Sequence, residues 1–549
     1  MDKELIHIIK RIDLPTLIDL VGPVIKKAIE SVNKADDEEA LAEVLVTKYG
    51  SSLLNNVAIR KAIIDSLDSD QIAQLCKDLN LSDHKSFENY NKALQYFHRY
   101  NIKKSQELVR FLGLSSEYLL KEISDDRPTK ENISIEYGEE IKALSFLHPY
   151  QKQVKDQIMT RFLQKVERKF FVQMPTGAGK TYTALECVVD YLRMPRSINE
   201  NGLPVPHKFI VWLVDRNELA EQAFQSFKKL WRMRGDREIN GFRLFAGFEP
   251  EFNSEGGGVV FCGFDKFHAV LKNPEHRIYS SVKFLIENTG VVIVDEAHHS
   301  LAETYFATIQ KFVNIPFIKL VGLSATPGTT DYTTTQQLVE LYSNDKITLR
   351  DEDWKEVGDS VHYLQERGYL AQLKTQLLET SFSSHEVDTG RILDELASDS
   401  ERNERILEQI EIAHNNQEST LVFACTLDHV FALMIMCRYR DIPTKFIVGE
   451  VDQSDRIQIL ESFKKNEFYV LLNLDILSTG IDLPNINKII LARPISSPNL
   501  ISQIIGRALR GPKNGGNTMN TIINLKDNII NFPGASFLYN YYEEHWEKV

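Results

Sequence analysis

The sequence predicts an α/β fold with two tandem units, each a parallel sheet covered by helices on both faces, preceded by an all-α N-terminal domain. Short apolar runs such as KFFVQM, KFIVWLV and GVVIVDEA alternate with amphipathic helical segments from about residue 140 onward. Apolar runs of this length are typical of strands that are buried on both faces of a parallel sheet. The same alternation returns after about residue 400 in TLVFACT, YVLLNL and KIILARP, which indicates a second unit of the same kind.

The region before the first unit has a helical periodicity. Segments such as LPTLIDLVGPVIKKAIESV place apolar residues three and four positions apart. A polar stretch then predicts a linker. The predicted divisions are a helical accessory or regulatory domain at 1–123, a linker at 124–140, a first α/β unit at 141–335, a second at 336–530 and a C-terminal capping segment at 531–549. The aromatic run FLYNYYEEHW in the last segment could stack bases, but we favour a capping helix.

Composition narrows the functional class. The 549-residue chain has a net charge of −13, which argues against a protein that coats nucleic acid by bulk electrostatics, although a local basic groove stays compatible with it. No run of about 18 apolar residues predicts a membrane span, and the charged N-terminus lacks the apolar core of a signal peptide. The cysteines form no CxxC pair, which argues against a zinc site or a disulfide framework. We expect a cytoplasmic protein, and abundant Ile, Lys and Asn indicate a bacterial source.

The stretch FVQMPTGAGKTYTALE has the features of a loop that wraps nucleotide phosphates. It lies between a predicted strand and a predicted helix, so backbone N–H groups at the helix start would face phosphate oxygens. Lys180 would neutralise the β- and γ-phosphates of ATP, and Thr181 would ligate Mg²⁺. The full pattern asks for a glycine where this chain has Met174. The predicted nucleotide-binding residues of the loop are Thr176, Gly177, Ala178, Gly179, Lys180 and Thr181.

A predicted buried strand at 291–294 ends in the acidic sequence Asp295-Glu296-Ala297-His298. Carboxylates at the C-terminal end of a strand lie where open α/β sheets bind ligands. Asp295 would hold the magnesium ion, and Glu296 would polarise the attacking water. An exposed acidic turn is the alternative for this tetrapeptide alone. The phosphate loop upstream favours the catalytic interpretation.

Together these motifs resemble the superfamily 2 helicases and DNA translocases of the DEAD/DEAH-box type, and most of all the XPB-like and restriction-enzyme motor-subunit branch (the R subunits of type I and type III enzymes). The resemblance covers about residues 140–530. PTGAGKT is similar to motif I, and this family tolerates Met174; DEAH is similar to motif II, VFACT (422–426) to motif IV and STGIDLP (478–484) to motif V. The resemblance implies two RecA-like domains that bind ATP in the cleft between them.

The resemblance also assigns residues outside the phosphate loop. LHPYQ (147–151) is similar to the adenine-contacting element, with His148 where arginine is usual. His298-His299 beside acids could suggest a metal pair. The family context instead assigns His298 to coupling between the ATP site and motif III, which Ser324-Ala325-Thr326 matches. The implied nucleotide-binding residues are Gln151, Gly480 and Asp482, and the implied coupling residues are His298, Ser324, Ala325 and Thr326.

QIIGRALR (503–510) is similar to motif VI of the family. Phosphoryl transfer spreads negative charge over the γ-phosphate oxygens, and an arginine from another element can accelerate the reaction by about 10³–10⁵-fold. Arg507 and Arg510 lie about one helical turn apart and can face one cleft, while Gln503 could reach the γ-phosphate or the water. The first arginine of the motif is replaced by Ile504. A solvated basic helix face is the alternative for the two arginines.

Nucleic-acid contacts of a motor use hydroxyls, backbone N–H groups and basic side chains without reading bases. For each residue that the resemblance nominates, a purely structural role is an equal alternative. The nominated residues are Arg216, Lys266, Thr426, Ser478 and Thr479.

The resemblance implies an ATP hydrolase that moves along duplex or single-stranded DNA. It suggests DNA repair or antiviral defence against foreign DNA, with a separate protein partner such as a nuclease, which the N-terminal helices would recruit. The sequence contains no carboxylate pair with a nearby strand lysine that we would assign to a nuclease, so we expect a motor without a cutting domain. Two alternatives stay open: an RNA helicase, and a nucleotide-gated DNA-binding scaffold that does not translocate.

Overall fold

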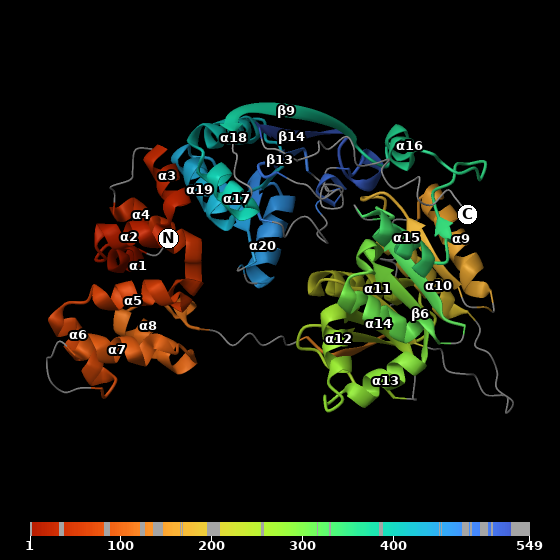
Figure 1. Cartoon of the computed structure of the whole chain (residues 1–549), viewed down its shortest axis with the longest axis horizontal. Helices are drawn as coiled ribbons and strands as arrows, with labels where there is room; N and C mark the ends of the chain where they lie inside the picture. Colours follow the sequence, from red (N-terminus) through yellow and green to blue (C-terminus); the bar gives the residue numbers. More distant parts are fainter. Residues whose placement is uncertain are drawn as a thin grey trace.

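The computed structural model forms an arch of three units (Figure 1). An N-terminal helical unit (3–120) and a first α/β unit (127–349) form the two sides, and a second α/β unit (369–528) lies at the top between them. This arrangement confirms the predicted fold class. The described residues are 3–31, 38–81, 88–120, 127–135, 147–164, 166, 168–194, 209–253, 257–315, 317–328, 331–383, 388–449, 451, 453–474, 483, 486–494, 503–506 and 509–528. The predicted capping segment at 531–549 lies outside them.

The N-terminal unit is built from short amphipathic helices with side-chain caps. Asn56, Asp68 and Asn101 each accept backbone N–H groups in the first turn of the helix that follows them, which satisfies donors that the helix leaves free. None of the described helices of the chain combines the length and apolarity that crossing a membrane requires. The helices are α1 (Lys3–Ile9), α2 (Leu14–Val21), α3 (Pro23–Ser31), α4 (Glu38–Tyr49), α5 (Val57–Asp65), α6 (Ser69–Asp78), α7 (Glu88–His98) and α8 (Ile102–Leu112).

The first α/β unit contains an eight-stranded sheet in the order β1-β4-β5-β3-β6-β7-β2-β8. All of its ladders are parallel except β1–β4. Successive residues of FIVWLV alternate between two hydrophobic clusters on opposite faces, which explains why this strand is apolar throughout. The strands are β1 (Lys130–Ile133), β2 (Arg168–Gln173), β3 (Phe209–Val214), β4 (Ile239–Leu244), β5 (Gly258–Gly263), β6 (Thr289–Asp295), β7 (Lys319–Ser324) and β8 (Lys346–Ile347).

Helices cover both faces of this sheet. One cluster joins the sheet to α9, α10 and α11, and the other joins it to α12, α13, α14 and α15. The helices are α9 (Pro149–Leu163), α10 (Lys180–Arg193), α11 (Asn217–Arg234), α12 (Phe264–Lys272), α13 (Tyr279–Glu287), α14 (Glu303–Val313) and α15 (Tyr332–Leu341).

Two predicted boundaries differ from the structure. Strand β1 lies inside the predicted linker, where Glu131 pairs with the buried Arg243 at 2.7 Å and draws the segment onto the sheet edge. The first unit also extends beyond residue 335, because α15 packs on its sheet and β8 pairs with β2. Residues 328–345 are largely polar in sequence, but the apolar side of α15 belongs to the core.

The second α/β unit contains a six-stranded parallel sheet in the order β11-β12-β10-β13-β14-β9. One face packs on α18, α19 and the N-terminal unit, and the other faces α20 and the first unit. The strands are β9 (Gln372–Ser383), β10 (Thr420–Phe423), β11 (Thr444–Ile447), β12 (Val470–Asn473), β13 (Lys488–Leu491) and β14 (Met519–Asn528). The helices are α17 (Thr389–Ser398), α18 (Ser400–Asn415), α19 (Leu427–Tyr439) and α20 (Gln453–Lys464), and α16 (Ser360–Glu366) precedes the unit.

Candidate ATP and nucleic-acid sites

The predicted phosphate loop joins the C-terminal end of β2 to the start of α10. Gly177 and Gly179 have φ angles of +83° and +81°, a left-handed conformation that disfavours other residues. A Cβ at Gly179 would lie 2.5 Å from Gln151 Nε2, so the loop also needs glycine for space. Met174 is fully buried in the core, and its N–H donates to Ser324 O at 3.2 Å. Its position precedes the turn, which explains why the loop forms without a glycine there.

Gln151 connects the start of α9 to the phosphate loop. Its Oε1 accepts the His148 N–H at 2.9 Å, and its Nε2 donates to Ala178 O at 3.0 Å. The hydroxyl of Tyr150 donates to the same carbonyl at 3.0 Å. The predicted adenine-contacting element therefore holds the loop directly, with the Gln151 amide engaged at both ends.

Thr181 and Asp295 meet at the end of the sheet, as a magnesium site requires. Thr181 Oγ1 donates to Asp295 Oδ2 at 3.2 Å, and Lys180 is buried in the same region. Burial raises the pKa of Asp295 to about 7, and the neighbouring charge of Glu296 adds to this shift. Two adjacent carboxylates at a buried strand end fit a divalent cation, which would offset their repulsion. Thr181 and Asp295 would hold Mg²⁺, and phosphate and water oxygens would supply its other ligands.

His298 connects the acidic motif to the end of β7. Its Nδ1 lies 2.9 Å from Ser324 Oγ and 3.4 Å from Glu296 Oε2. Ser324 Oγ in turn lies 3.4 Å from Thr326 Oγ1 and accepts the Thr326 N–H at 3.2 Å. Burial holds the pKa of His298 well below its ordinary value, so the ring is neutral. Glu296 has a φ of +50°, an uncommon conformation for glutamate that turns the chain into this contact. Ala325, predicted with these residues, lies between Ser324 and Thr326.

The segment similar to motif VI faces the phosphate loop across the two α/β units. A Cβ at Gly177 would lie 3.4 Å from Gly506 O and 3.6 Å from Leu509 Cβ. Gly506 touches the Thr176 side chain so closely that no larger residue fits there. Arg510 pairs with Leu370 in a β-bridge beside this contact, and Gln503 is half-buried. Arg507 lies outside the described residues.

Two residues that sequence reasoning missed also connect the units at this cleft. His148 Nε2 lies 2.7 Å from Asn514 Oδ1, and Asn514 Nδ2 donates to Tyr369 O at 2.7 Å. The Tyr369 ring packs against the rings of His148 and Tyr150, with centroids 4.6 and 5.0 Å apart. No motif marked Tyr369 or Asn514, and the only available signal was the glycine-rich turn that contains Asn514.

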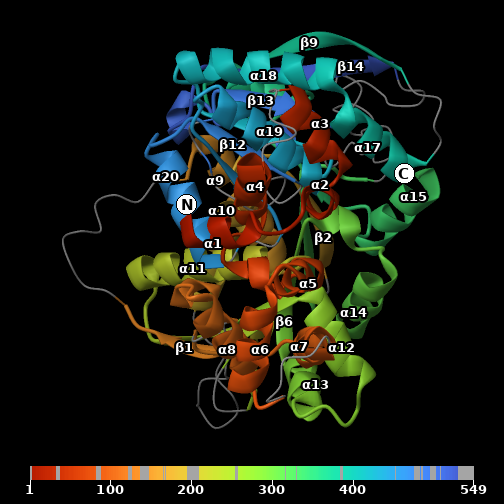
Figure 2. The ribbon, with the colours of Figure 1, turned by 90° about the vertical axis from the view of Figure 1, so that its left-hand side faces the viewer.

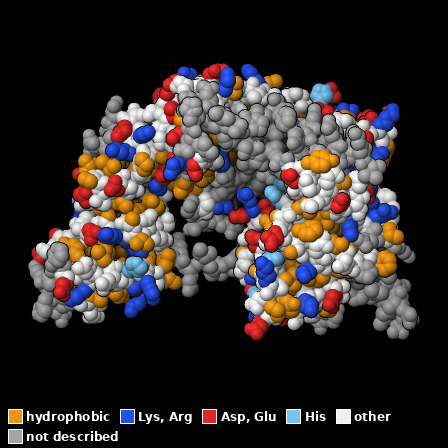
Figure 3. Space-filling model, viewed as in Figure 1, with side chains coloured by type: hydrophobic (Ala, Val, Ile, Leu, Met, Phe, Trp, Pro, Cys, Tyr) orange, Lys and Arg blue, Asp and Glu red, His pale blue; other side chains and the backbone are white. Residues whose placement is uncertain are grey.

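The structure brings two predicted nucleic-acid contacts, Arg216 and Lys266, to one surface pocket of about 490 Å³. The pocket lies at the C-terminal ends of β3 and β5, before α11 and α12. Lys266 Nζ lies 2.6 Å from Glu249, and Asp215, Glu218 and Asp265 also line the pocket. The described lining is therefore not a dense basic patch. Acidic and basic side chains are likewise mixed over the face shown in Figure 3.

Thr426 lies on the second unit and caps α19. Its Oγ1 accepts the His429 N–H at 3.2 Å, and the residue is partly exposed. The other predicted residues of this unit, Ser478, Thr479, Gly480 and Asp482, lie outside the described residues.

Family models match both α/β units. Residues 145–329 match the type III restriction enzyme res subunit, and residues 401–512 match the helicase conserved C-terminal domain. The Saccharomyces cerevisiae protein IRC3, named as an ATP-dependent helicase, is 26% identical over 376 residues, which is 66% of this chain and 49% of the yeast protein. The EcoKI type I restriction enzyme endonuclease subunit of Escherichia coli is 23% identical over 478 residues, which is 78% of this chain and 37% of that subunit.

The chain thus spans about half the length of the yeast relatives that it matches. Among solved structures, S. cerevisiae Dbp5 bound to RNA and ADP BeF3 is similar, with a TM-score of 0.47 and 14% identity over 75% of this chain and 93% of that one. The two family models, in chain order on the two α/β units, identify the class. The chain belongs to the superfamily 2 helicases, and the restriction-enzyme branch is among its relatives.

Proposed function

We propose that the chain is an ATP-dependent motor on DNA that hydrolyses ATP between its two α/β units. The observation that carries this proposal is the approach of Gly506 to Thr176 and Gly177, which sets the motif VI segment of one unit against the phosphate loop of the other. Because the site is divided between two units, nucleotide binding draws the units together and nucleotide release lets them separate. A motor converts this cycle of closing and opening into movement.

We assign one role to each site residue. Lys180, at the first turn of α10, neutralises phosphate charge, and Glu296 orients the attacking water. Arg510, with Arg507, stabilises the charge that develops in the transition state. Thr181 and Asp295 would hold Mg²⁺, which would supply further neutralisation of that charge. His298 and Ser324 transmit changes at the γ-phosphate site to the end of β7.

The track contacts are sequence-independent in this proposal. Arg216 and Lys266 on the first unit and Thr426 on the second contact the phosphate backbone of DNA. Alternate gripping by the two units then advances the protein along the strand. A role in repair or antiviral defence, a bacterial cytoplasmic location and recruitment of a separate nuclease stay predictions.

The test is the steady-state ATPase rate without polymer and with single-stranded DNA, duplex DNA or RNA. Stimulation by DNA supports the proposal, and stimulation by RNA alone would establish the RNA-helicase alternative. Lys180→Ala should abolish the rate, because the phosphates then lack their main cation. Lys311→Ala is the matched control, since Lys311 is exposed on α14 and should leave the rate unchanged. A rate that survives Lys180→Ala would refute the assigned site.

A second assay separates a motor from a nucleotide-gated scaffold. A translocating motor displaces a triplex-forming strand from duplex DNA at the expense of ATP, or unwinds a partial duplex. A scaffold would hydrolyse ATP in the same solution and displace neither strand. Hydrolysis with no displacement on any DNA substrate would therefore contradict translocation while leaving the ATP site in place.

A further inference from the structure

Helix α19 of the second unit is buried on every side. Residues 429–437, HVFALMIMC, are all buried. A helix that is apolar all round must be covered on more than one face. The sheet of the second unit covers one side, and the N-terminal unit, through α3, covers another within the same hydrophobic cluster. Figure 2 shows α3 and α4 lying over α19 when this side faces the viewer.

Ion pairs join the N-terminal unit to both ends of α19. Lys48 Nζ, on α4, lies 2.7 Å from Asp428 Oδ1 in the first turn of α19, and Glu43 lies 2.9 Å from Arg438 in the last turn. The Lys48 side chain is only 9% exposed, and its ammonium group also lies 5.9 Å from the ring centre of Phe431. An ammonium group that is buried this far and bound to both a carboxylate and an aromatic ring is a specific contact.

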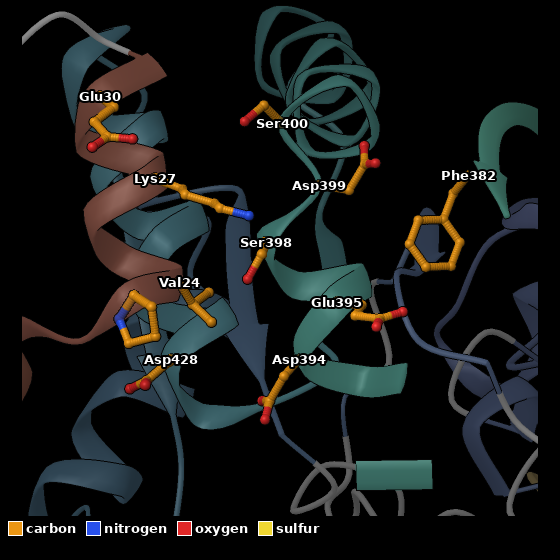
Figure 4. A pocket seen from close by; sticks show the side chains of 11 residues that line it. Val24, Lys27, Glu30, Phe382, Asp394, Glu395, Ser398, Asp399, Ser400 and Asp428 are labelled. Atoms are coloured by element: carbon orange, nitrogen blue, oxygen red, sulfur yellow. The ribbon is translucent and has the colours of Figure 1, made fainter. Parts of the chain in front are cut away.

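Beside this contact, one part of the seam is open and polar. Where α3 faces the junction of α17 and α18, a pocket of about 870 Å³ separates the units. Lys27 points into it from α3, while Asp394, Glu395 and Asp399 lie on the opposite side (Figure 4). Lys27 faces these carboxylates across an open pocket, where water screens the attraction between opposite charges, so this part of the seam contributes little. The packing of α3 on α19, with α17 beside it, and the two ion pairs therefore hold the two units together.

The first turn of α19 also carries the candidate nucleic-acid contact. Thr426 is its N-cap, two residues before Asp428. From inside the second unit, His429 Nδ1 accepts the Cys425 N–H at 3.1 Å, and its Nε2 lies 2.9 Å from Asn403 Oδ1. From outside, Lys48 is bound to Asp428. The loop at 425–426 is thus held between the core of the second unit and the N-terminal unit.

We infer that the N-terminal unit is a positioning element for the nucleic-acid contact of the second unit, and that Lys48 acts on Thr426 through Asp428. This inference rests on the proposed function, because it assigns Thr426 to the track. The N-terminal unit and the second unit then move together as one body. A change in its docking is transmitted to the affinity of the motor for nucleic acid.

The first test is the polymer concentration that gives half-maximal ATPase stimulation. Lys48→Met keeps the apolar stem and removes the ammonium group, and it should raise that concentration by about 5- to 20-fold with an unchanged rate at saturation. Lys92→Met is the matched control, because Lys92 is a partly exposed lysine of the same unit whose described ion pair is with Glu88 of its own helix. Lys48→Met should add little to Thr426→Ala, since both act on one contact. Equal effects of the two methionine variants, or additive effects with Thr426→Ala, would overturn the inference.

A second measurement remains decisive if no polymer stimulates the wild-type ATPase, which would refute the proposed function alone. Hydrogen exchange of the amides at 425–431 should quicken in Lys48→Met, because the His429 N–H bond to Thr426 depends on a fixed first turn. The same amides should exchange at the wild-type rate in Lys92→Met. Unchanged exchange in Lys48→Met would show that Lys48 does not position this turn.

Discussion

Replacement of Arg402 by methionine should destabilise the second unit, because Arg402 is the most deeply buried cation among the described residues of that unit. The side chain is fully buried, and it makes a bidentate contact to Asp527 at 2.9 and 3.0 Å. Its Nη2 also donates to Ala492 O at 2.8 Å, and its Nη1 lies against Cys425 Sγ. Arg402 thus ties α18 to β14 and to the end of β10.

The size of the effect follows from what Arg402→Met leaves behind. Asp527 is 6% exposed, so without arginine its charge stays in a poorly solvated place. Breaking one side of a buried ion pair costs about 3–5 kcal/mol, which is roughly a 10²- to 10³-fold or larger increase in the unfolding equilibrium constant. Methionine fills most of the volume, so a cavity adds little. Replacing both partners by Arg402→Met and Asp527→Leu should recover most of the loss, because no buried charge remains.

Calorimetry tests this prediction. A chain with several units need not unfold in one step, and calorimetry can separate the unfolding transition of each unit. The transition of the second unit should shift to lower temperature in Arg402→Met and return toward the wild-type temperature in the double variant. A single variant within about 1 kcal/mol of the wild type would refute the reasoning, since that is the cost of an exposed pair. A double variant less stable than the single one would show that the arginine acts through packing and not through charge.

Three further outcomes are expected. Gly506→Ala should collide with Thr176 across the cleft and lower kcat by about 10²-fold, while Gly358→Ala, which has open space, should not; equal rates would refute the contact. Because a raised pKa keeps Asp295 protonated below about pH 7 and ionised above it, Mg²⁺ titrations of the ATPase should show weaker apparent binding as pH falls through that value; a flat profile would contradict the shift. Arg243→Met should lower the thermal stability of the first unit by about 3–5 kcal/mol and speed hydrogen exchange in β1, and unchanged exchange would show that β1 is held otherwise.

The sequence predicted those features that depend on neighbours along the chain. The phosphate loop, the acidic strand end and the apolar strands are each encoded within a short segment, so their physical signals are local. The contact of His148 with Asn514 joins residues 366 positions apart, and nothing in either segment indicates the other as its partner. Contacts of this kind depend on how two folded units pack against each other, and no pattern within one short segment predicts that packing.

The contact between the N-terminal unit and the second unit could not be predicted from the sequence, for a related reason. The apolar run at 429–437 indicates a helix buried all round, but it does not say what covers each face. Strand β1 was missed because its four residues, KENI, are short and mostly polar, and Glu131 is held by the distant Arg243. Of the carboxylates near Arg216 and Lys266, Asp215, Glu218 and Asp265 are their neighbours in sequence, and only the contact of Lys266 with Glu249 was beyond local reasoning.

The path of the chain has a practical consequence for anyone who shortens or cuts this protein. The N-terminal unit packs on the second unit, yet the next described segment, 127–135, contains strand β1 at the edge of the first unit's sheet. A protease cut at 121–126 would therefore leave the released fragment attached, and the two pieces should migrate together on a sizing column. Deleting residues 1–120 instead would uncover the apolar side of α19, so an insoluble product would say nothing about regulation. Co-expression of the two pieces as separate chains is the cleaner way to ask what the helices contribute.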